Sequence, residues 1–272
     1  MDALSQVDIS KLKQLIPEMP DSVPGHELYH MELNVNPYAL KRGSAVGLYI
    51  FLFYKVPVPP GHVVDHSGTH NPGPSPEFVW MMKSLLTLLG PGASYNQVKK
   101  LTTQEFEKNI RPATPQPKSI GAIFRDTRFT GNIASFAFAV SAADLPITLE
   151  EIRKEIGENA FAGAVAVRFV KGTRATLGFT KFENTCVVEM DGLDSKANHT
   201  VFTNVIKRME TQSIPYSIHW GKLNAPLNKG RTLAIYGKEK LKTWKQSRLQ
   251  LLPFTTLPVF INAFMEKCGL EK

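Results

Sequence analysis

The chain has 272 residues, 43% of them hydrophobic and 21% charged, and its formal net charge is +8. These values are typical of one large or two small globular domains with a sizeable core. The positive charges form no long run and no zinc-finger spacing, so a nucleic-acid partner is not favoured. A diffuse positive surface fits an acidic ligand and an anionic membrane surface equally well.

Compartment signals favour a cytoplasmic protein. Cys186 and Cys268 lie far apart in apolar patterns and in no metal or redox spacing, so we expect two buried thiols. The first residues lack the basic start and apolar run of a signal peptide. The longest apolar run, 46–58, is too short to span a bilayer and contains Lys55, so no membrane span is expected.

Residues 1–118 are expected to hold two strands, a proline-rich loop and a main helix, and to complete the same sheet as the rest of the chain. The second strand, within 44–56, is apolar on both faces, which is typical of a strand in the middle of a covered sheet. The helix is expected from Pro76 to about Leu89, because it has proline at its start and an apolar stripe. The polar, proline-punctuated stretch 94–118 has room for one short helix and marks the boundary.

A histidine-rich loop lies between this second strand and the helix. His62, His66 and His70 recur every four residues, and on a helix that spacing would gather three imidazoles into a metal site. The surrounding prolines and glycines argue against a helix. The sequence therefore favours a solvated loop with incidental histidines, and metal binding is the alternative.

Residues 119–272 are expected to form an α+β unit, with helices packed on one face of an antiparallel sheet. Thr148 and Glu151 have the spacing of a capping box at the start of the first helix. Short turns make three successive strands antiparallel neighbours. In chain order the expected elements are a strand at 132–140, a helix at 148–157, strands at 163–170, 174–182 and 185–191, a helix at 196–210 and a strand at 215–219.

Versatile side chains gather in the stretch PYSIHWGKLN, residues 215–224. The end of a strand often delivers such groups to a small-molecule site. His219 could move a proton near neutral pH, and Lys222 could neutralise charge on a substrate oxygen or a flavin, so both are catalytic candidates. Trp220 and Asn224 are candidates for substrate binding. The alternative is an ordinary strand end with an exposed lysine and a half-buried tryptophan.

A further candidate is Arg168, in the strand FAGAVAVRFV. Alternation along the strand places its guanidinium on one face with Ala164 and Ala166, which leaves room for a ligand above the sheet. The guanidinium could hold a carboxylate, carbonyl or enolate oxygen, and an exposed arginine on a solvated face is the alternative. Glu189 on the strand TCVVEMDG is another substrate-binding candidate whose direction the pattern leaves open.

The order of these segments resembles the substrate (cap) domain and C-terminal segment of the vanillyl-alcohol-oxidase type of FAD-linked oxidases, which includes sugar-lactone oxidases and flavin-bound cholesterol oxidases. The resemblance covers roughly 120–270. It rests on the strands before His219, the His-Trp-x-Lys stretch itself, and the segments LPFTTLPVFINAF and EKCGL after it. It implies that His219 and Lys222 lie beside a flavin.

The resemblance also identifies a departure at the expected substrate site. In lactone oxidases the strand of Arg168 carries Glu-x-Arg, and both groups contact the substrate. Here the glutamate position is Ala166, which puts lactone or sugar oxidation in doubt. Glu189 has the polarity to replace the missing carboxylate.

The family's FAD-binding domain has no counterpart before residue 120, because no glycine-rich strand-to-helix turn is present there. We therefore expect no FAD to be bound by this chain alone, with any FAD supplied by a partner chain.

Three functions remain open. One is the substrate half of a FAD-linked oxidoreductase acting on a largely apolar, oxygenated metabolite, such as a polyketide- or terpenoid-like product of secondary metabolism. Another is a flavin-independent cyclase or isomerase that uses the inherited cavity. The third is a non-catalytic remnant that binds a small molecule or a partner. In all three we expect Arg168, His219 and Lys222 to face one cavity over the helix-free face of the sheet, with Ala164 and Ala166 in its floor.

Overall fold

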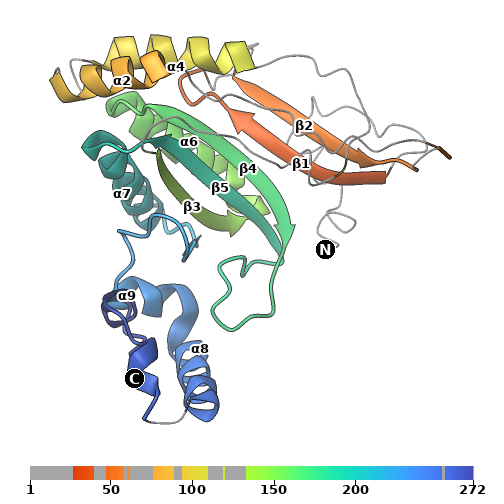
Figure 1. Cartoon of the computed structure of the whole chain (residues 1–272), viewed down its shortest axis with the longest axis vertical. Coiled ribbons are helices and arrows are strands. Elements are labelled where there is room, and N and C mark those ends of the chain that lie inside the picture. Colours follow the sequence, from red (N-terminus) through yellow and green to blue (C-terminus); the bar gives the residue numbers. More distant parts are fainter. Residues whose placement is uncertain are drawn as a thin grey trace.

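The protein folds around a six-stranded antiparallel sheet with the strand order β2-β1-β4-β5-β3-β6 (Figure 1). The computed structural model describes residues 27–39, 47–57, 60–61, 76–88, 94–109, 119, 133–252 and 255–271. The strands are β1 (Glu27–Val35), β2 (Leu48–Lys55), β3 (Ile133–Ser141), β4 (Gly163–Lys171), β5 (Asn184–Leu193) and β6 (Ser217–Ile218). The helices are α2 (Pro76–Leu88), α4 (Tyr95–Asn109), α6 (Leu145–Glu158), α7 (Lys196–Thr211), α8 (Lys229–Leu251) and α9 (Ala263–Lys267), with short 3-10 turns η1 (Ala142–Asp144) and η2 (Leu257–Phe260). The α+β fold with an antiparallel sheet is confirmed.

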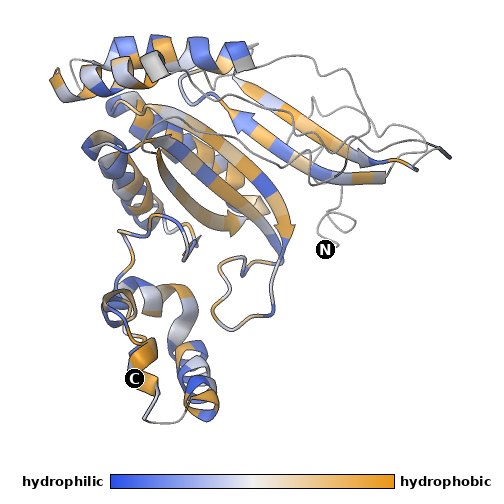
Figure 2. Ribbon diagram, viewed as in Figure 1, coloured by the Kyte–Doolittle hydropathy of each residue, from blue (hydrophilic) through white to orange (hydrophobic). Residues whose placement is uncertain are grey.

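Helices α6 and α7 lie side by side on one face of the sheet (Figure 1). Strand alternation supplies the core between these layers, and Figure 2 shows the strands striped by hydropathy. Phe136 of β3 stacks on Phe202 of α7 with ring centroids 5.2 Å apart, and both rings are buried. Burying one such ring contributes about 1.5–3 kcal/mol. We call the opposite face of the sheet, which carries Arg168 and Glu189, the open face.

Strands from the two halves of the chain form a single sheet, because β1 pairs with β4. The expectation that the strand at 44–56 lies in the middle of the sheet is wrong, since β2 is at one end of the described sheet. One side of β2 packs on the core, and on the other side Tyr49 packs against Phe106 of α4, with ring centroids 5.3 Å apart. A helix therefore uses the second apolar face of β2, where we expected the sheet to be covered on both sides.

The expected strand at 174–182 is also wrong, because residues 172–183 form a loop between the directly paired strands β4 and β5. Gly172 begins this loop where a Cβ would lie only 2.4 Å from the carbonyl oxygen of Phe182. The backbone of the loop pairs partly within the loop, where the Thr173 N–H donates to the carbonyl oxygen of Thr180 at 2.7 Å, and the loop also bonds to other elements. The Lys181 ammonium, for example, donates to the carbonyl oxygen of Ile235 at 2.6 Å.

The capping box expected at Thr148 is not formed, because α6 begins earlier, at Leu145. Pro146 occupies the first turn, where its fixed backbone angle suits a helix start. The buried Thr148 hydroxyl donates to the carbonyl oxygen of Asp144 at 2.7 Å. The helix expected at 196–210 is confirmed as α7, whose start is capped by Ser195.

The C-terminal part contains α8 and α9, which lie below the sheet in the view of Figure 1. Helix α8 contains a kink at Gly237, whose φ of 76° favours glycine. Tyr236, just before the kink, stacks on Trp220 with ring centroids 5.6 Å apart. Among the described residues, no helix has the length and apolar character needed to cross a membrane.

Candidate functional site

The candidate site is centred on Glu189, a largely buried carboxylate on the open face of β5. Its two oxygens are held by two different cations. Arg168 Nη1 lies 2.6 Å from Glu189 Oε2, and Lys222 Nζ lies 2.7 Å from Glu189 Oε1. The Glu189 side chain is 9% exposed, whereas those of Arg168 and Lys222 are 39% and 24% exposed. The two cations therefore present charge at the surface above a buried counter-ion.

Sheet register explains why these groups meet. Glu189 is the cross-strand partner of Ala166 in β4 and of Ala137 in β3. Arg168 lies two residues beyond Ala166, so alternation returns its side chain to the same face. The neighbouring strand β5 therefore brings a carboxylate next to Arg168. The small side chains on either side leave Glu189 without bulky cross-strand neighbours.

His219 joins this row of side chains across the sheet. Its backbone N–H donates to the carbonyl oxygen of Ala137 at 2.9 Å, which continues the pairing of β6 with β3. The strand pairings and ion pairs place Arg168, His219 and Lys222 on the face opposite α6 and α7. The cavity expected above Ala164 and Ala166 stays a prediction.

The His219 ring is poised as a neutral hydrogen-bond donor. Its Nδ1 accepts from the backbone N–H of Gly221 at 3.0 Å, so the proton of the neutral ring is on Nε2. The ring packs edge-on against Phe179, with centroids 4.6 Å apart. Burial lowers the pKa of His219, the charge of Lys222 lowers it further, and Glu189 opposes the shift. Near neutral pH the ring can therefore offer an Nε2–H to a ligand oxygen.

Three further residues, which the sequence pattern did not single out, extend the network. Arg168 Nε donates to Glu32 Oε2 at 3.0 Å, because Glu32 of β1 lies directly opposite Arg168. On the other side, Lys222 Nζ lies 3.9 Å from Asp191 Oδ1, and the Ser135 hydroxyl donates to the same oxygen at 2.5 Å. Alternation in MELNVN places Glu32 on one face of its strand, but only the pairing of β1 with β4 brings it to Arg168.

The network holds one more carboxylate than cations. It contains the carboxylates of Glu32, Glu189 and Asp191 and the cations of Arg168 and Lys222. Burial raises the pKa of Asp191, although its hydrogen bond from Ser135 and the Lys222 charge oppose the shift. An anionic ligand would add negative charge to a network whose carboxylates already outnumber its cations. An uncharged oxygen can accept from exposed N–H groups without disturbing these pairs.

Glu32 makes the stability of this network depend on pH. Burial acts to raise its pKa, but a hydrogen bond from His30 and the Arg168 charge outweigh burial and hold the pKa at about 2, below its ordinary value of 4.5. A carboxyl group whose pKa is lowered by folding stabilises the folded protein fully at pH values above the pKa it has in the unfolded chain. This stabilisation is lost as the pH falls through the pKa it has in the folded protein.

We therefore expect urea unfolding to show a loss of stability between pH 4.5 and about 2 that is smaller in Glu32→Gln. The difference between the two proteins should be on the order of 2–3 kcal/mol near neutral pH and should vanish toward pH 2. Identical pH profiles for the two proteins would contradict this assignment.

Trp220 and Asn224, the other two sequence candidates, are engaged within the protein. The Trp220 indole N–H donates to the carbonyl oxygen of Leu177 at 2.8 Å, and its ring also meets Phe264 edge-on. The Asn224 amide donates to the carbonyl oxygen of Trp220 at 3.0 Å. These contacts tie the strand end to the 172–183 loop and the C-terminal segment. A substrate-binding role for either residue stays a prediction.

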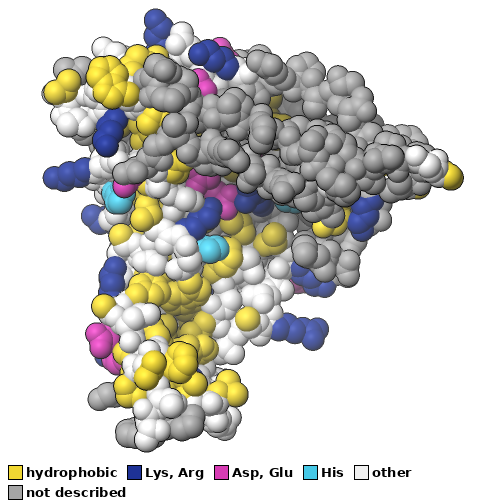
Figure 3. Space-filling model, in the orientation of Figure 1, with side chains coloured by type: hydrophobic (Ala, Val, Ile, Leu, Met, Phe, Trp, Pro, Cys, Tyr) yellow, Lys and Arg dark blue, Asp and Glu magenta, His cyan; other side chains and the backbone are white. Residues whose placement is uncertain are grey.

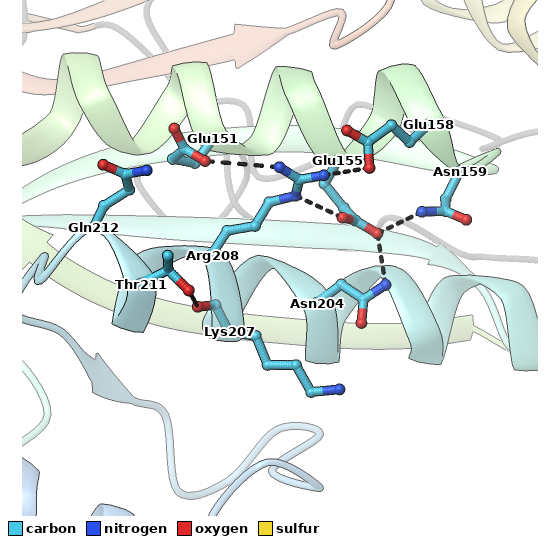
Figure 4. A pocket seen from close by; sticks show the side chains of 9 residues that line it. All are labelled: Glu151, Glu155, Glu158, Asn159, Asn204, Lys207, Arg208, Thr211 and Gln212. Carbon is cyan, nitrogen blue, oxygen red and sulfur yellow. Dashed lines mark hydrogen bonds and ion pairs between the residues drawn. The ribbon is translucent and has the colours of Figure 1, made fainter.

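A separate hollow of about 350 Å³ lies between α6 and α7 (Figure 4). Arg208 lies between the two helices and donates from Nε to Glu155 Oε2 at 2.8 Å. The other Glu155 oxygen accepts from Asn159 and Asn204 at 2.8 and 2.9 Å. Both oxygens of the buried carboxylate are thus satisfied by the protein, which identifies a helix-pairing network. None of the sequence candidates lines this hollow.

Metal ligation finds no support in the described ranges, which contain no group of three or more His, Cys, Asp or Glu side chains able to hold an ion. The histidines at 62, 66 and 70 lie outside those ranges. Cys186 and Cys268 are both buried and free, as expected from the sequence.

No protein-family model matches the chain, and a comparison with curated proteins gave no match.

Proposed function

We propose that this chain binds a largely apolar, uncharged, oxygen-bearing small molecule on the open face and forms the substrate half of a FAD-linked oxidoreductase. The observation that carries the proposal is the double ion pair at Glu189, which fixes Arg168 and Lys222 on the open face, where Lys222 and Glu189 act on the pKa of His219. Fixed donors around small side chains are the usual construction of a site that orients a carbonyl or hydroxyl oxygen.

Each side chain has a distinct part in this proposal. Arg168 and Lys222 supply N–H groups whose charge is already balanced, so they polarise an oxygen without requiring an anionic ligand. His219 donates its Nε2–H to the same region and can deliver a proton there. The small side chains of Ala164 and Ala166 leave room for a ligand above the sheet beside these donors.

The flavin is proposed to come from another chain, where it would accept a hydride from the substrate. In the described residues the strand-to-helix connections 141–145 and 193–196 contain no glycine, and the connection from β6 to α8, residues 219–228, contains the single glycine Gly221 and is not glycine-rich. A pyrophosphate-binding turn needs glycine for close backbone approach, so these connections do not fit a bound FAD.

We expect the chain purified alone to carry no flavin, so that its absorption spectrum lacks bands in the visible region. Stoichiometric FAD released on denaturation of this single chain would contradict the proposal of a separate flavin-bearing chain. Mixing with a FAD-bearing partner should instead produce a coloured complex.

A flavin-independent isomerase or cyclase is the second candidate, and it is favoured by the environment of His219. A neutral imidazole beside Lys222 and Glu189 can move a proton without any redox cofactor. Burial lowers the pKa of His219 below its ordinary value of 6.5. Activity that needs the neutral ring should therefore be constant from neutral pH down to pH 6.5 and should fall only at lower pH. A pH–rate profile that falls already above pH 6.5 would contradict this role.

A further inference from the structure

The C-terminal end of α8 carries exposed apolar side chains at the end of the molecule opposite α2 and α4 (Figure 1). Leu251 and Val259 are 80% and 79% exposed, and Leu249 and Phe260 are also exposed. In Figure 3 hydrophobic side chains gather over this C-terminal region. We call these four residues, on the last turn of α8 and on η2, the apolar tip.

The apolar tip is held in place by Arg248. Its Nη1 donates to the carbonyl oxygen of Leu270 at 3.0 Å, and its Nη2 donates to those of Leu257 and Phe260 at 3.4 and 3.3 Å. The Leu257 side chain is buried, which anchors η2 against the rest of the protein. Val259 and Phe260 are therefore presented to solvent by an anchored turn.

Three lysines that form no ion pair within the described residues precede the apolar tip on α8. Lys240, Lys242 and Lys245 lie on the last turns of α8, and the sequence contains no Asp or Glu from residue 240 to residue 265. None of the three lysines forms an ion pair with a carboxylate in the described part of the chain. The charge of Lys240 also contributes, after burial, to lowering the pKa of Lys181.

We propose that the apolar tip inserts into an anionic lipid surface while Lys240, Lys242 and Lys245 contact the lipid phosphates. Lys245, Lys242 and Lys240 precede Leu251 by about 9, 14 and 17 Å along the helix axis, at 1.5 Å per residue. An interfacial segment buries its apolar side chains about 5–10 Å deep, so these ammonium groups reach the headgroup layer. Charge complementarity thus selects anionic lipid as the occupant.

Other occupants fit the same residues less well. Nucleic acid would use the lysines but leave the apolar side chains in water. A protein partner that covered the apolar side chains would also have to supply carboxylates for the three lysines, whereas an anionic lipid surface supplies both an acyl layer and phosphates. The apolar tip lies beyond the three lysines along the chain. The tip can therefore enter the acyl layer of a membrane while the lysines contact the phosphate layer.

The test is co-sedimentation of the full chain with phosphatidylcholine vesicles that contain about one-third phosphatidylglycerol. We expect binding that weakens as salt is added, and no binding to pure phosphatidylcholine vesicles. Changing Lys240, Lys242 and Lys245 to Gln should weaken binding about 100-fold, since each basic residue near an anionic surface contributes roughly a fivefold factor.

The matched control changes Lys83, Lys99 and Lys100 to Gln, which removes the same charge from α2 and α4 at the other end of the molecule (Figure 1). It should alter binding by less than about twofold, because charges beyond a Debye length are screened. An equal loss in both triple variants would show that only net charge matters and would overturn the proposal. Absence of vesicle binding by the unaltered chain, as expected of a protein-docking surface, would also overturn it.

Insertion is tested separately with Val259→Cys labelled by an environment-sensitive dye. The native Cys186 and Cys268 are buried, so the introduced thiol is the accessible one. A blue shift of the dye with anionic vesicles supports insertion of the apolar tip. Vesicle binding without a blue shift overturns it, and this readout does not depend on removing any apolar side chain.

Discussion

Replacing Arg168 by methionine is expected to lower the free energy of unfolding by about 3–4 kcal/mol at pH 7. The guanidinium contacts Glu32 and Glu189 at 3.0 and 2.6 Å, and both carboxylates are largely buried. Removing it leaves Glu189 with Lys222 as its remaining cation. A buried carboxylate that loses a partner costs far more than the lost contact contributes. Urea unfolding followed by circular dichroism measures the loss.

Two controls separate this mechanism from general damage to the sheet. Adding Glu189→Gln to Arg168→Met should recover part of the loss, because the uncharged amide no longer needs a cation. Arg153→Met, which breaks an exposed pair with Glu150 on α6, should cost less than about 0.5 kcal/mol. If Arg168→Met proves as mild as Arg153→Met, the ion pairs on the open face do not stabilise the fold.

Replacing Arg208 by methionine is expected to cost about 2–3 kcal/mol. This arginine bridges α7 to Glu155, Glu158 and Glu151 of α6, and Glu155 is 2% exposed. The loss should be smaller than at Arg168, because Glu155 keeps its hydrogen bonds from Asn159 and Asn204. In thermal unfolding, the Arg208→Met protein should have a lower midpoint temperature than the unaltered protein.

The neighbouring Lys207 provides the control for Arg208. It lines the same hollow, but its side chain is directed away from the glutamates (Figure 4). Lys207→Met should change the free energy of unfolding by less than about 0.5 kcal/mol. Equal effects at Arg208 and Lys207 would mean that the α6–α7 network is a solvated surface feature.

The fold class follows from the sequence because hydrophobic periodicity reports which face of each element is buried. The helix at 196–211 was predictable, since its apolar stripe and serine cap agree. The loop at 172–183 was not, because it forms hydrogen bonds with α8, with Ser217 of β6 and with Trp220, and a local pattern cannot contain these contacts. The edge position of β2 likewise depends on Tyr49 meeting Phe106 of a distant helix.

The candidate site was predictable in part, for a similar reason. The alternation of side chains along β4 and the His-Trp-x-Lys stretch predicted that Arg168, His219 and Lys222 lie on one face of the sheet. Parity alone could not orient Glu189 or connect it to Arg168, since this requires the β4–β5 register. Glu32 required the pairing of strands more than a hundred residues apart in the sequence.

The central claim, that the open face binds an uncharged oxygen-bearing molecule, is tested most directly by a nuclear magnetic resonance titration. Apolar lactones and ketones are compared with hydrocarbons of the same shape. The account predicts that the oxygenated compounds shift the signals of Arg168 Nε–H, the His219 ring and the Lys222 ammonium, and that the hydrocarbons do not. Unchanged signals at all three residues, or equal shifts from the hydrocarbons, would contradict it.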